Sequence, residues 1–215
     1  MHKSIGIASL ALLVAACLPS SQELVTQYNE DGVLLFERGE FDHARQSFEA
    51  AQHLAPEDPA ILYNLGQCHD RLGDAAKAEH LYRECLTRSA NHAACRHALA
   101  VLWVSASRQP EAERMIEDWL AREPKLSSPY AEDGWLWRLR GDLPRAQGRL
   151  QQALQIDPHD QRALTELALI YEEMQRPDRA LVLYERILDV NPRQPEIIRH
   201  MEQLRAQGAK PPKPE

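Results

Sequence analysis

The sequence predicts an all-α protein built from stacked helical hairpins, and three observations support this prediction. First, one pattern of small, aromatic and proline residues recurs without insertion or deletion in five windows of 34 residues: 25–58, 59–92, 93–126, 127–160 and 161–194. Second, glycines and prolines stand where helices would end or begin. Third, no segment shows the alternation of apolar and polar residues that is typical of a half-buried strand.

Each window has two positions that hold only small residues, which lets two helices approach closely. The first position holds Gly32, Gly66, Ala100, Gly134 and Ala168, and the second, twelve residues later, holds Ala44, Ala78, Ala112, Ala146 and Ala180. A larger apolar residue follows four residues after each of these alanines, one helical turn further along the same face: Phe48, Tyr82, Ile116, Leu150 and Tyr184. We expect this third residue to fill the space beside the close contact.

The boundaries between helices are marked by glycine and proline. A left-handed residue ending the first helix of a window is expected at Gly39, Gly73 and Gly141. Four windows close with a proline, namely Pro56, Pro124, Pro158 and Pro192. Each window therefore predicts helix, turn, helix, turn. The third window departs most from the pattern, with Ser107 at the turn.

This arrangement resembles the tetratricopeptide repeat, in which Trp, Leu-Gly, Tyr, Ala, Phe, Ala and Pro recur at fixed spacings. The first window carries the match at Tyr28, Gly32, Gly39, Phe41, Ala44, Phe48, Ala51 and Pro56. The resemblance implies a right-handed superhelical solenoid of about five hairpins over residues 25–194, with residues 195–207 as a polar-faced capping helix. We expect residues 208–215, which are rich in proline and lysine, to be disordered.

Residues 1–16 have the parts of an export signal. Lys3 precedes the apolar run Ile5–Ala16, which is too short to span a bilayer, and small residues lead up to Cys17. This boundary resembles a bacterial lipobox, which implies cleavage before Cys17 and lipidation of its thiol.

Residues 17–24 would then form the lipidated N-terminus and a short tether, which reaches at most about 25 Å from the lipid. Aspartate after the cysteine retains Gram-negative lipoproteins at the inner membrane, but Leu18 stands here. The resemblance therefore implies the periplasmic face of the outer membrane. The alternative is an ordinary secretory signal, whose cleavage would release the chain.

The charge of the chain disfavours two classes of partner. The net charge is −7, and loss of Lys3 with the signal would leave 24 basic against 32 acidic residues, a net of −8. Such a chain is not expected to bind nucleic acid or anionic lipid through charge. No phosphate-binding loop, zinc-protease pair or nucleophile elbow is present. We therefore expect no catalysis, no cofactor and no small-molecule substrate.

The cysteines raise a redox and a metal question. Cys85 and Cys95 lie at similar distances on either side of a turn, so antiparallel helices would place them opposite each other, as a disulfide or as free buried thiols. Cys68 would stay unpaired. His92, Cys95 and His97 suggest a metal site, but residues two apart on a helix point in different directions. We therefore expect no metal.

The resemblance also implies a concave groove lined by the first helix of each hairpin. The lining positions fall on Asn29, Val33, Phe36, Tyr63, Gln67, Asp70, His97, Val101, Val104, Trp135, Arg138, Arg162, Thr165, Leu169 and Glu172. An extended or helical peptide is expected to dock apolar side chains on Tyr63, Val101, Trp135 and Leu169, with Arg138 or Arg162 pairing with an acid. The alternative is that Trp135 or Tyr63 packs against its neighbouring repeat.

Together these features predict a non-catalytic protein–protein interaction scaffold, held at the bacterial envelope by an N-terminal lipid. Its partner would be an envelope protein or peptide, as for the tetratricopeptide lipoproteins that assist pilus, secretion or outer-membrane assembly. Two alternatives remain open. One is an accessory factor or hydrolase of cell-wall metabolism, and the other is a secreted tetratricopeptide protein without a lipid.

Overall fold

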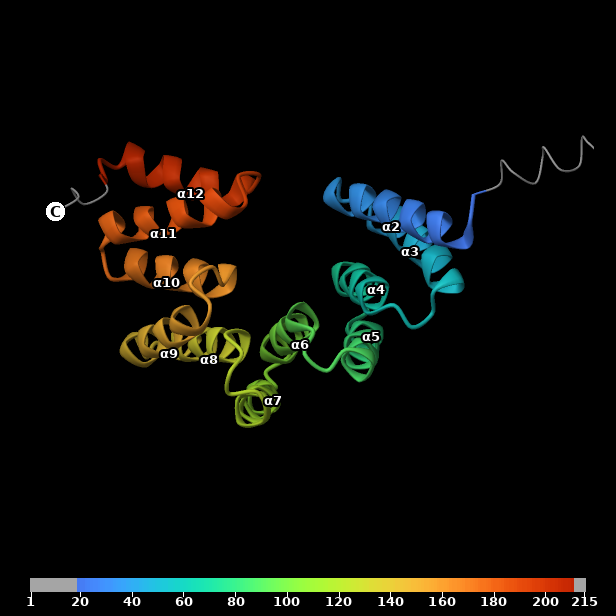
Figure 1. The fold of residues 1–215 in the computed structure, drawn as a ribbon, viewed down its shortest axis with the longest axis horizontal. Coiled ribbons are helices and arrows are strands. Elements are labelled where there is room, and N and C mark those ends of the chain that lie inside the picture. The colour runs from blue at the N-terminus through green and yellow to red at the C-terminus, as the bar shows by residue number, and fades with distance from the viewer. Residues whose placement is uncertain (1–18, 211–215) are drawn as a thin grey trace, which may run out of the picture. The chain divides into compact units, whose positions relative to one another are not determined.

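The computed structural model describes residues 19–210, and this part of the chain contains eleven helices and no strand (Figure 1). The helices are α2 (Ser21–Glu37), α3 (Phe41–Leu54), α4 (Pro59–Arg71), α5 (Ala75–Arg88), α6 (Ala93–Ser105), α7 (Gln109–Arg122), α8 (Ser128–Leu139), α9 (Leu143–Ile156), α10 (Gln161–Glu173), α11 (Pro177–Val190) and α12 (Pro195–Ala206). The all-α prediction is confirmed. The predicted signal peptide, Cys17 and the last five residues of the predicted tail lie outside the described residues.

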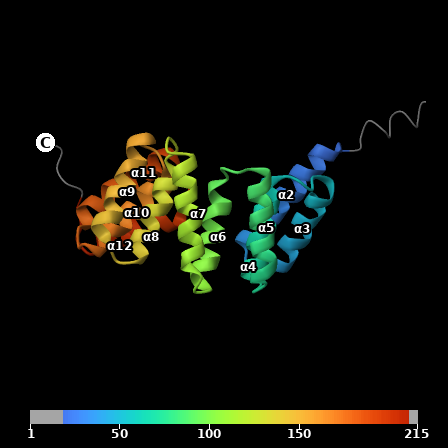
Figure 2. The same cartoon turned by 90° about the horizontal axis from the view of Figure 1, so that it is seen from below.

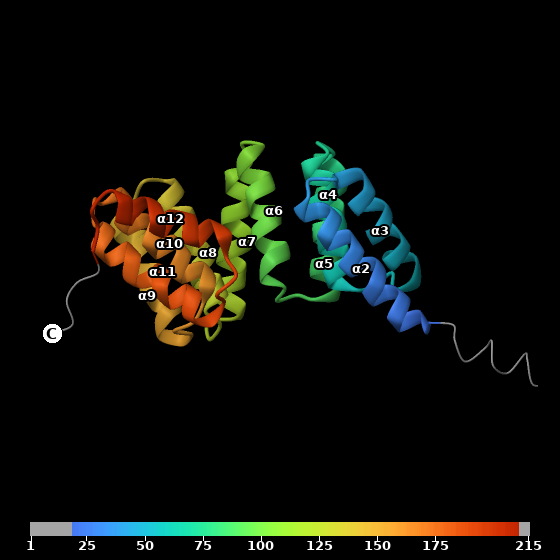
Figure 3. The ribbon, with the colours of Figure 1, turned by 90° about the horizontal axis from the view of Figure 1, so that it is seen from above.

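The helices pack in adjacent pairs within two compact units, and the division between the units falls inside α6, between Leu102 and Trp103. In the first unit α2 packs on α3, α4 packs on α5, and α3 contacts α4 (Figure 2). In the second unit α8 pairs with α9 and α10 with α11, while α8 also contacts α10 (Figure 3). Helix α12 packs on α11, in the stretch where the sequence predicts a capping helix.

Polar side chains satisfy the free backbone N–H groups at several helix starts. At α2, Ser20 and Glu23 form a reciprocal capping box. Aspartate side chains accept backbone N–H groups at the start of four further helices, namely Asp58, Asp74, Asp142 and Asp160. These local bonds explain why the helices begin where they do.

Left-handed residues end the first helix in every window. The φ angles are 80° at Gly39, 84° at Gly73 and 78° at Gly141, as the sequence predicts. In the two windows that lack this glycine, Ser107 and Gln175 adopt the same conformation at φ 59° and 56°. The turn geometry is therefore preserved even where the residue is unfavourable for it.

The small positions are sites of close packing between paired helices. A Cβ atom added at Gly32 would lie 2.5 Å from the ring of Phe48, and one added at Gly134 would lie 2.6 Å from Cγ of Leu150. Ala44 and Ala146, at the second small position, are fully buried. In the windows of Gly32, Gly66 and Gly134, the larger residue therefore packs directly on the small residue of the facing helix, which is the core contact of these hairpins.

Candidate functional site

The first unit contains a pocket of about 200 Å³ that we call the unit-1 groove. It is lined by Phe36, Tyr63, Gln67, Asp70, Arg71, Tyr82, His97, Ala98 and Val101. Six of these residues were predicted to line the groove, and they come from α2, α4 and α6. The structure thus brings together positions from three sequence windows at one site.

Aromatic packing forms the walls of the unit-1 groove. The Tyr63 ring lies 6.2 Å from the ring of Tyr82 and 5.8 Å from the ring of His92, measured between centroids. The guanidinium of Arg71 lies 5.9 Å from the ring centroid of Phe36, so this cation also contacts an aromatic wall. These contacts hold the aromatic side chains of the groove in place within the unit.

The polar groups of the unit-1 groove carry both signs of charge. Asp70 and Arg71 are neighbours at the end of α4, and both are exposed. Burial raises the pKa of the Tyr82 phenol, and Asp70 and Tyr63 add to this effect.

Two predicted groove residues of α2, Asn29 and Val33, do not line this pocket. Val33 is the more open of the two, with 37% of its surface exposed. Asn29, also on α2, accepts a hydrogen bond at 2.9 Å from the side-chain amide of Asn64 on α4. This bond links the first helices of two successive hairpins. Val104, near the end of α6, is half-buried and does not line the unit-1 groove.

In the second unit, two predicted contact residues have internal roles. Trp135 is only 6% exposed, so it packs in the interior, which is the alternative that the sequence left open. Arg138 donates hydrogen bonds at 2.8 Å to both Glu166 and Glu173. Burial alone would lower the pKa of the Arg138 guanidinium, but these two carboxylates raise it. Its charge is therefore paired within the chain, and an acidic partner would have to compete with these two carboxylates.

The other predicted residues of the second unit lie on α10. Arg162 and Thr165 line a pocket of about 350 Å³ together with Gln161, Gln194, Glu196 and Ile197. Arg162 lies 3.5 Å from both Glu132 and Glu166. Leu169 is half-buried, and Glu172 accepts a short hydrogen bond from the hydroxyl of Tyr184. This pocket is polar and its arginine is partly neutralised, so it offers fewer anchoring side chains than the unit-1 groove.

A further pocket, of about 440 Å³, was not predicted from the sequence. It is lined by Trp137, Arg145, Gly148, Arg149 and Gln152 on α8 and α9. Guanidinium carbons lie 4.7 and 4.6 Å from the Trp137 ring, from Arg140 and Arg145 respectively. The sequence feature that could have indicated this pocket is Gly148, a glycine inside a helix, because open space lies where its side chain would stand.

The buried carboxylates of the second unit have structural partners. Asp160 caps α10 by accepting the N–H of Ala163 at 2.9 Å. Asp133 lies 2.7 Å from the guanidinium of Arg149, although burial raises the pKa of this carboxyl.

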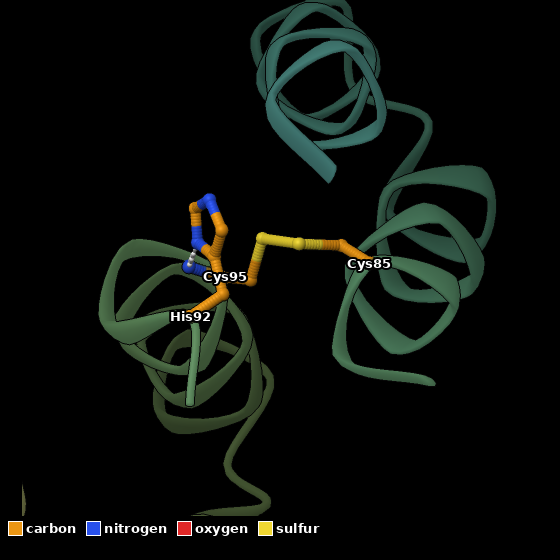
Figure 4. A group of neighbouring side chains, drawn as sticks. All are labelled: Cys85, His92 and Cys95. Atoms are coloured by element: carbon orange, nitrogen blue, oxygen red, sulfur yellow. Dashed lines mark hydrogen bonds between the residues drawn. A yellow bond between two sulfur atoms is a disulfide. The ribbon is translucent and has the colours of Figure 1, made fainter. Parts of the chain in front are cut away.

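The structure joins Cys85 in α5 to Cys95 in α6 by a disulfide with a sequence separation of ten (Figure 4). Cys68 is free and buried, and burial raises the pKa of its thiol to about 11. Of the residues that the sequence raised as metal candidates, His92 and Cys95 lie beside Cys85, while His97 lines the unit-1 groove. The potential ligand atoms of Cys85, His92 and Cys95 lie within 4.8 Å of one another.

Over residues 19–210, none of the helices has the length and apolar character needed to cross a bilayer.

Comparison with known proteins identifies the repeats. Two tetratricopeptide repeat models match, over residues 31–94 and 138–204. Among curated proteins, the chain is 33% identical over 178 residues to cellulose synthase operon protein C of Xanthomonas axonopodis pv. citri (strain 306). It is 23% identical over 208 residues to the human protein O-mannosyl-transferase TMTC3. The matches take in 79% and 89% of this chain but only 12% and 23% of the length of those relatives.

Solved structures show the same fold. A thermophilic tetratricopeptide repeat protein of Thermus thermophilus superposes with a TM-score of 0.65 at 23% identity, over 85% of this chain and 99% of that one. The Pseudomonas aeruginosa pilF structure superposes with a TM-score of 0.55 at 14% identity, over 87% and 86%. Because the two repeat models together take in more than half of the residues, the chain belongs to the tetratricopeptide repeat family.

Proposed function

We propose that this chain is a scaffold that holds an extended segment of an envelope protein in the unit-1 groove. Proteins of the tetratricopeptide family are generally protein-interaction scaffolds. The proposal rests on one observation. Six predicted residues, which come from the first helices of three successive hairpins, line one pocket. A pocket lined by the first helices of three successive hairpins suits an extended chain, because each helix presents a separate contact along the bound chain.

The lining of the unit-1 groove indicates the kind of segment that fits. Phe36, Tyr63 and Val101 offer apolar contact, and aromatic residues are common anchors of protein interfaces. Asp70 and Arg71 can pair with charges of either sign beside that apolar contact. The preferred segment therefore has an apolar or aromatic residue flanked by polar ones.

A charge placed in the unit-1 groove tests this proposal. Val101 is 39% exposed and lines the groove, so Val101→Glu leaves the fold intact while placing a carboxylate where apolar contact is expected. We expect capture of the partner from envelope extract to fall by about tenfold or more. Quantitative mass spectrometry of the co-purified proteins measures the change.

Val190→Glu is the matched control. Val190 is 59% exposed at the end of α11 and lines none of the three pockets described above. This variant should capture the partner as the unchanged chain does. Equal capture by the Val101→Glu and Val190→Glu variants would remove the unit-1 groove as the binding site.

We also propose that the mature chain is anchored by lipid on Cys17 and lies at the periplasmic face of the outer membrane. The support comes from the sequence, in which small residues precede Cys17 and Leu18 follows it. Two acyl chains or more give stable membrane attachment, whereas one alone binds marginally. Mass spectrometry of the mature N-terminus distinguishes the two outcomes, because a lipidated cysteine is heavier by its acyl chains. An unmodified N-terminus would show a secreted chain.

The machine that uses this scaffold is proposed to be one for pilus, secretion or outer-membrane assembly. A second candidate is an accessory role in cell-wall or polysaccharide synthesis. The observation that favours it is the 33% identity to a protein named for the cellulose synthase operon. The identity of the captured partner separates these two candidates, since the first predicts an assembly protein and the second a synthase or wall enzyme.

A further inference from the structure

Three side chains that can bind metal meet at the junction of α5 and α6. Cys85 lies in the last turn of α5, Cys95 is the third residue of α6, and His92 directly precedes that helix. Figure 4 shows the His92 imidazole beside the sulfur of Cys95, with Cys85 reaching across from the neighbouring helix. Both cysteines are fully buried, whereas His92 is only half-buried and gives access to the group from outside.

The chemistry of this set is that of a known class of metal site. Two thiolates and one imidazole, with a fourth position left for water, form one of the standard zinc sites. In tetrahedral coordination, Zn–S bonds of about 2.3 Å and a Zn–N bond of about 2.0 Å place the ligand atoms about 3.5–3.8 Å apart. The three potential ligand atoms here lie within 4.8 Å of one another, so once the disulfide is reduced, side-chain rotations that separate the two sulfur atoms can bring all three to these distances.

We propose that Cys85, His92 and Cys95 form a redox-gated zinc site. In the oxidised protein the disulfide occupies both sulfur atoms and excludes the metal. A dithiol reductant transfers two electrons and two protons to the disulfide, which yields two cysteine thiols and the cyclic disulfide of the reductant. Zn²⁺ then displaces the two thiol protons and binds the two thiolates and the imidazole, with no change in its own oxidation state.

His92 has a second role that shapes the test. Its Nδ1 accepts the backbone N–H of Cys95 at 3.2 Å, so His92 caps the N-terminus of α6. A neutral imidazole has one accepting nitrogen. A metal on Nδ1 uses the lone pair that accepts from Cys95, and a metal on Nε2 moves the ring proton to Nδ1, so metal binding removes this cap in either case. His92→Asn separates the two roles, because asparagine is a strong N-cap but lacks the imidazole.

The experiment uses Co²⁺ as a spectroscopic substitute for zinc. The full chain is reduced with dithiothreitol, separated from reductant without oxygen and titrated with Co²⁺, alongside the oxidised chain. We expect the reduced chain to bind one equivalent with thiolate-to-cobalt absorption that added Zn²⁺ abolishes, and the oxidised chain to bind none. Because the two samples share one sequence, this comparison does not depend on any variant folding.

Variants assign the ligands. Cys85→Ser should abolish the thiolate absorption of a two-sulfur site, and His92→Asn should weaken Co²⁺ binding by about tenfold or more. Cys68→Ala and His80→Asn are the controls and should bind normally, since Cys68 lies outside the group and the His80 side chain is exposed on α5. The melting temperature of oxidised His92→Asn checks that its fold is intact.

Three results would overturn the proposal. The first is a reduced chain that gives no thiolate absorption with excess Co²⁺. The second is an absorption that persists unchanged in the Cys85→Ser variant. The third is equal Co²⁺ affinity in His92→Asn and the unchanged chain, which would leave a thiol pair without the imidazole. None of these results depends on the partner bound in the unit-1 groove.

Discussion

At the residue scale, three glycines inside helices differ in how closely other side chains approach them. At Gly32 and Gly134, a Cβ atom would overlap the side chain of the facing helix. Gly148, in the middle of α9, has nothing within 4 Å of the place where its Cβ would stand. The first two are required by close approach, whereas the third is a helix-interior glycine without a packing reason.

Alanine at two of these positions should therefore change stability in opposite directions. Gly134→Ala forces Leu150 away from its packed position, and we expect the free energy of unfolding to fall by about 1–3 kcal/mol. Gly148→Ala removes backbone freedom from the unfolded chain, so unfolding should become harder by about 0.5–1 kcal/mol. Urea denaturation of the two variants measures both. A change of the same sign in both would contradict the packing described for Gly134.

Arg138 offers a second prediction at this scale, because its partner is buried. Glu166 has only 5% of its side chain exposed and lies 2.8 Å from Arg138. Arg138→Met keeps the apolar stem but removes the charge, and we expect a loss of about 3 kcal/mol in unfolding free energy. This loss is at the low end of the range expected for breaking a buried ion pair, because Arg162 remains 3.5 Å from Glu166.

The control for Arg138 is an exposed ion pair. Arg122 and Asp118 lie 3.9 Å apart with 76% and 73% of their side chains exposed. Arg122→Met should leave the denaturation midpoint nearly unchanged, since solvent screens such pairs. If the two methionine variants lost similar stability, burial of Glu166 would not be the cause.

At the element scale, the helices bury side chains against their neighbours, and the covalent link between α5 and α6 adds to this packing. The disulfide closes a loop with a sequence separation of ten. Closing a loop of this length restricts the unfolded chain and stabilises the folded one by about 2–3 kcal/mol. The wall of the unit-1 groove formed by α6 is thereby tied to the wall formed by α4 and α5.

Reduction of the disulfide in the presence of a metal chelator should lower the unfolding free energy of the first unit by about 2–3 kcal/mol. The measurement is chemical denaturation with and without dithiothreitol. A variant with both Cys85→Ala and Cys95→Ala should not respond to the reductant, while Cys68→Ala should respond as the unchanged chain does. A response in the double variant would place the effect elsewhere in the protein.

At the scale of the whole molecule, the net negative charge bears on whether lipid or charge could hold the chain at a membrane. The chain has a net charge of −7, so a patch-driven attraction to anionic lipid is not expected. Attachment through acyl chains depends on hydrophobic transfer and is insensitive to ionic strength, whereas charge-driven attachment weakens with salt. Salt dependence therefore reports how the chain is held.

We expect the mature protein to stay in the membrane fraction after a wash with concentrated sodium chloride, and to be released by detergent. Cys17→Ser should move the protein to the soluble fraction, because it removes the thiol that would carry the lipid. Quantitative immunoblots of the fractions measure both effects. Release of the unchanged protein by salt alone would show that charge, and not lipid, holds it.

The repeat pattern by itself determined most of the fold. Helix ends at Gly39, Gly73 and Gly141 follow from backbone conformation at single residues, which is local information. Pairing of small and large positions recurs in every window, so the same contact is encoded five times in the sequence. The family's lining positions also identified six residues of the unit-1 groove, because a helix position sets the face on which a side chain lies.

Tertiary structure alone decided what those side chains do once they share a face. Trp135 is covered and Arg138 is paired with Glu166, which lies 28 residues further along the chain. Likewise, His92 joins Cys85 and Cys95 through a turn and two helices. Helical periodicity assigns a direction to each side chain, but burial and ion pairing depend on which neighbours compete for that space. Only the packing of separate helices decides which neighbours cover a side chain or pair with it.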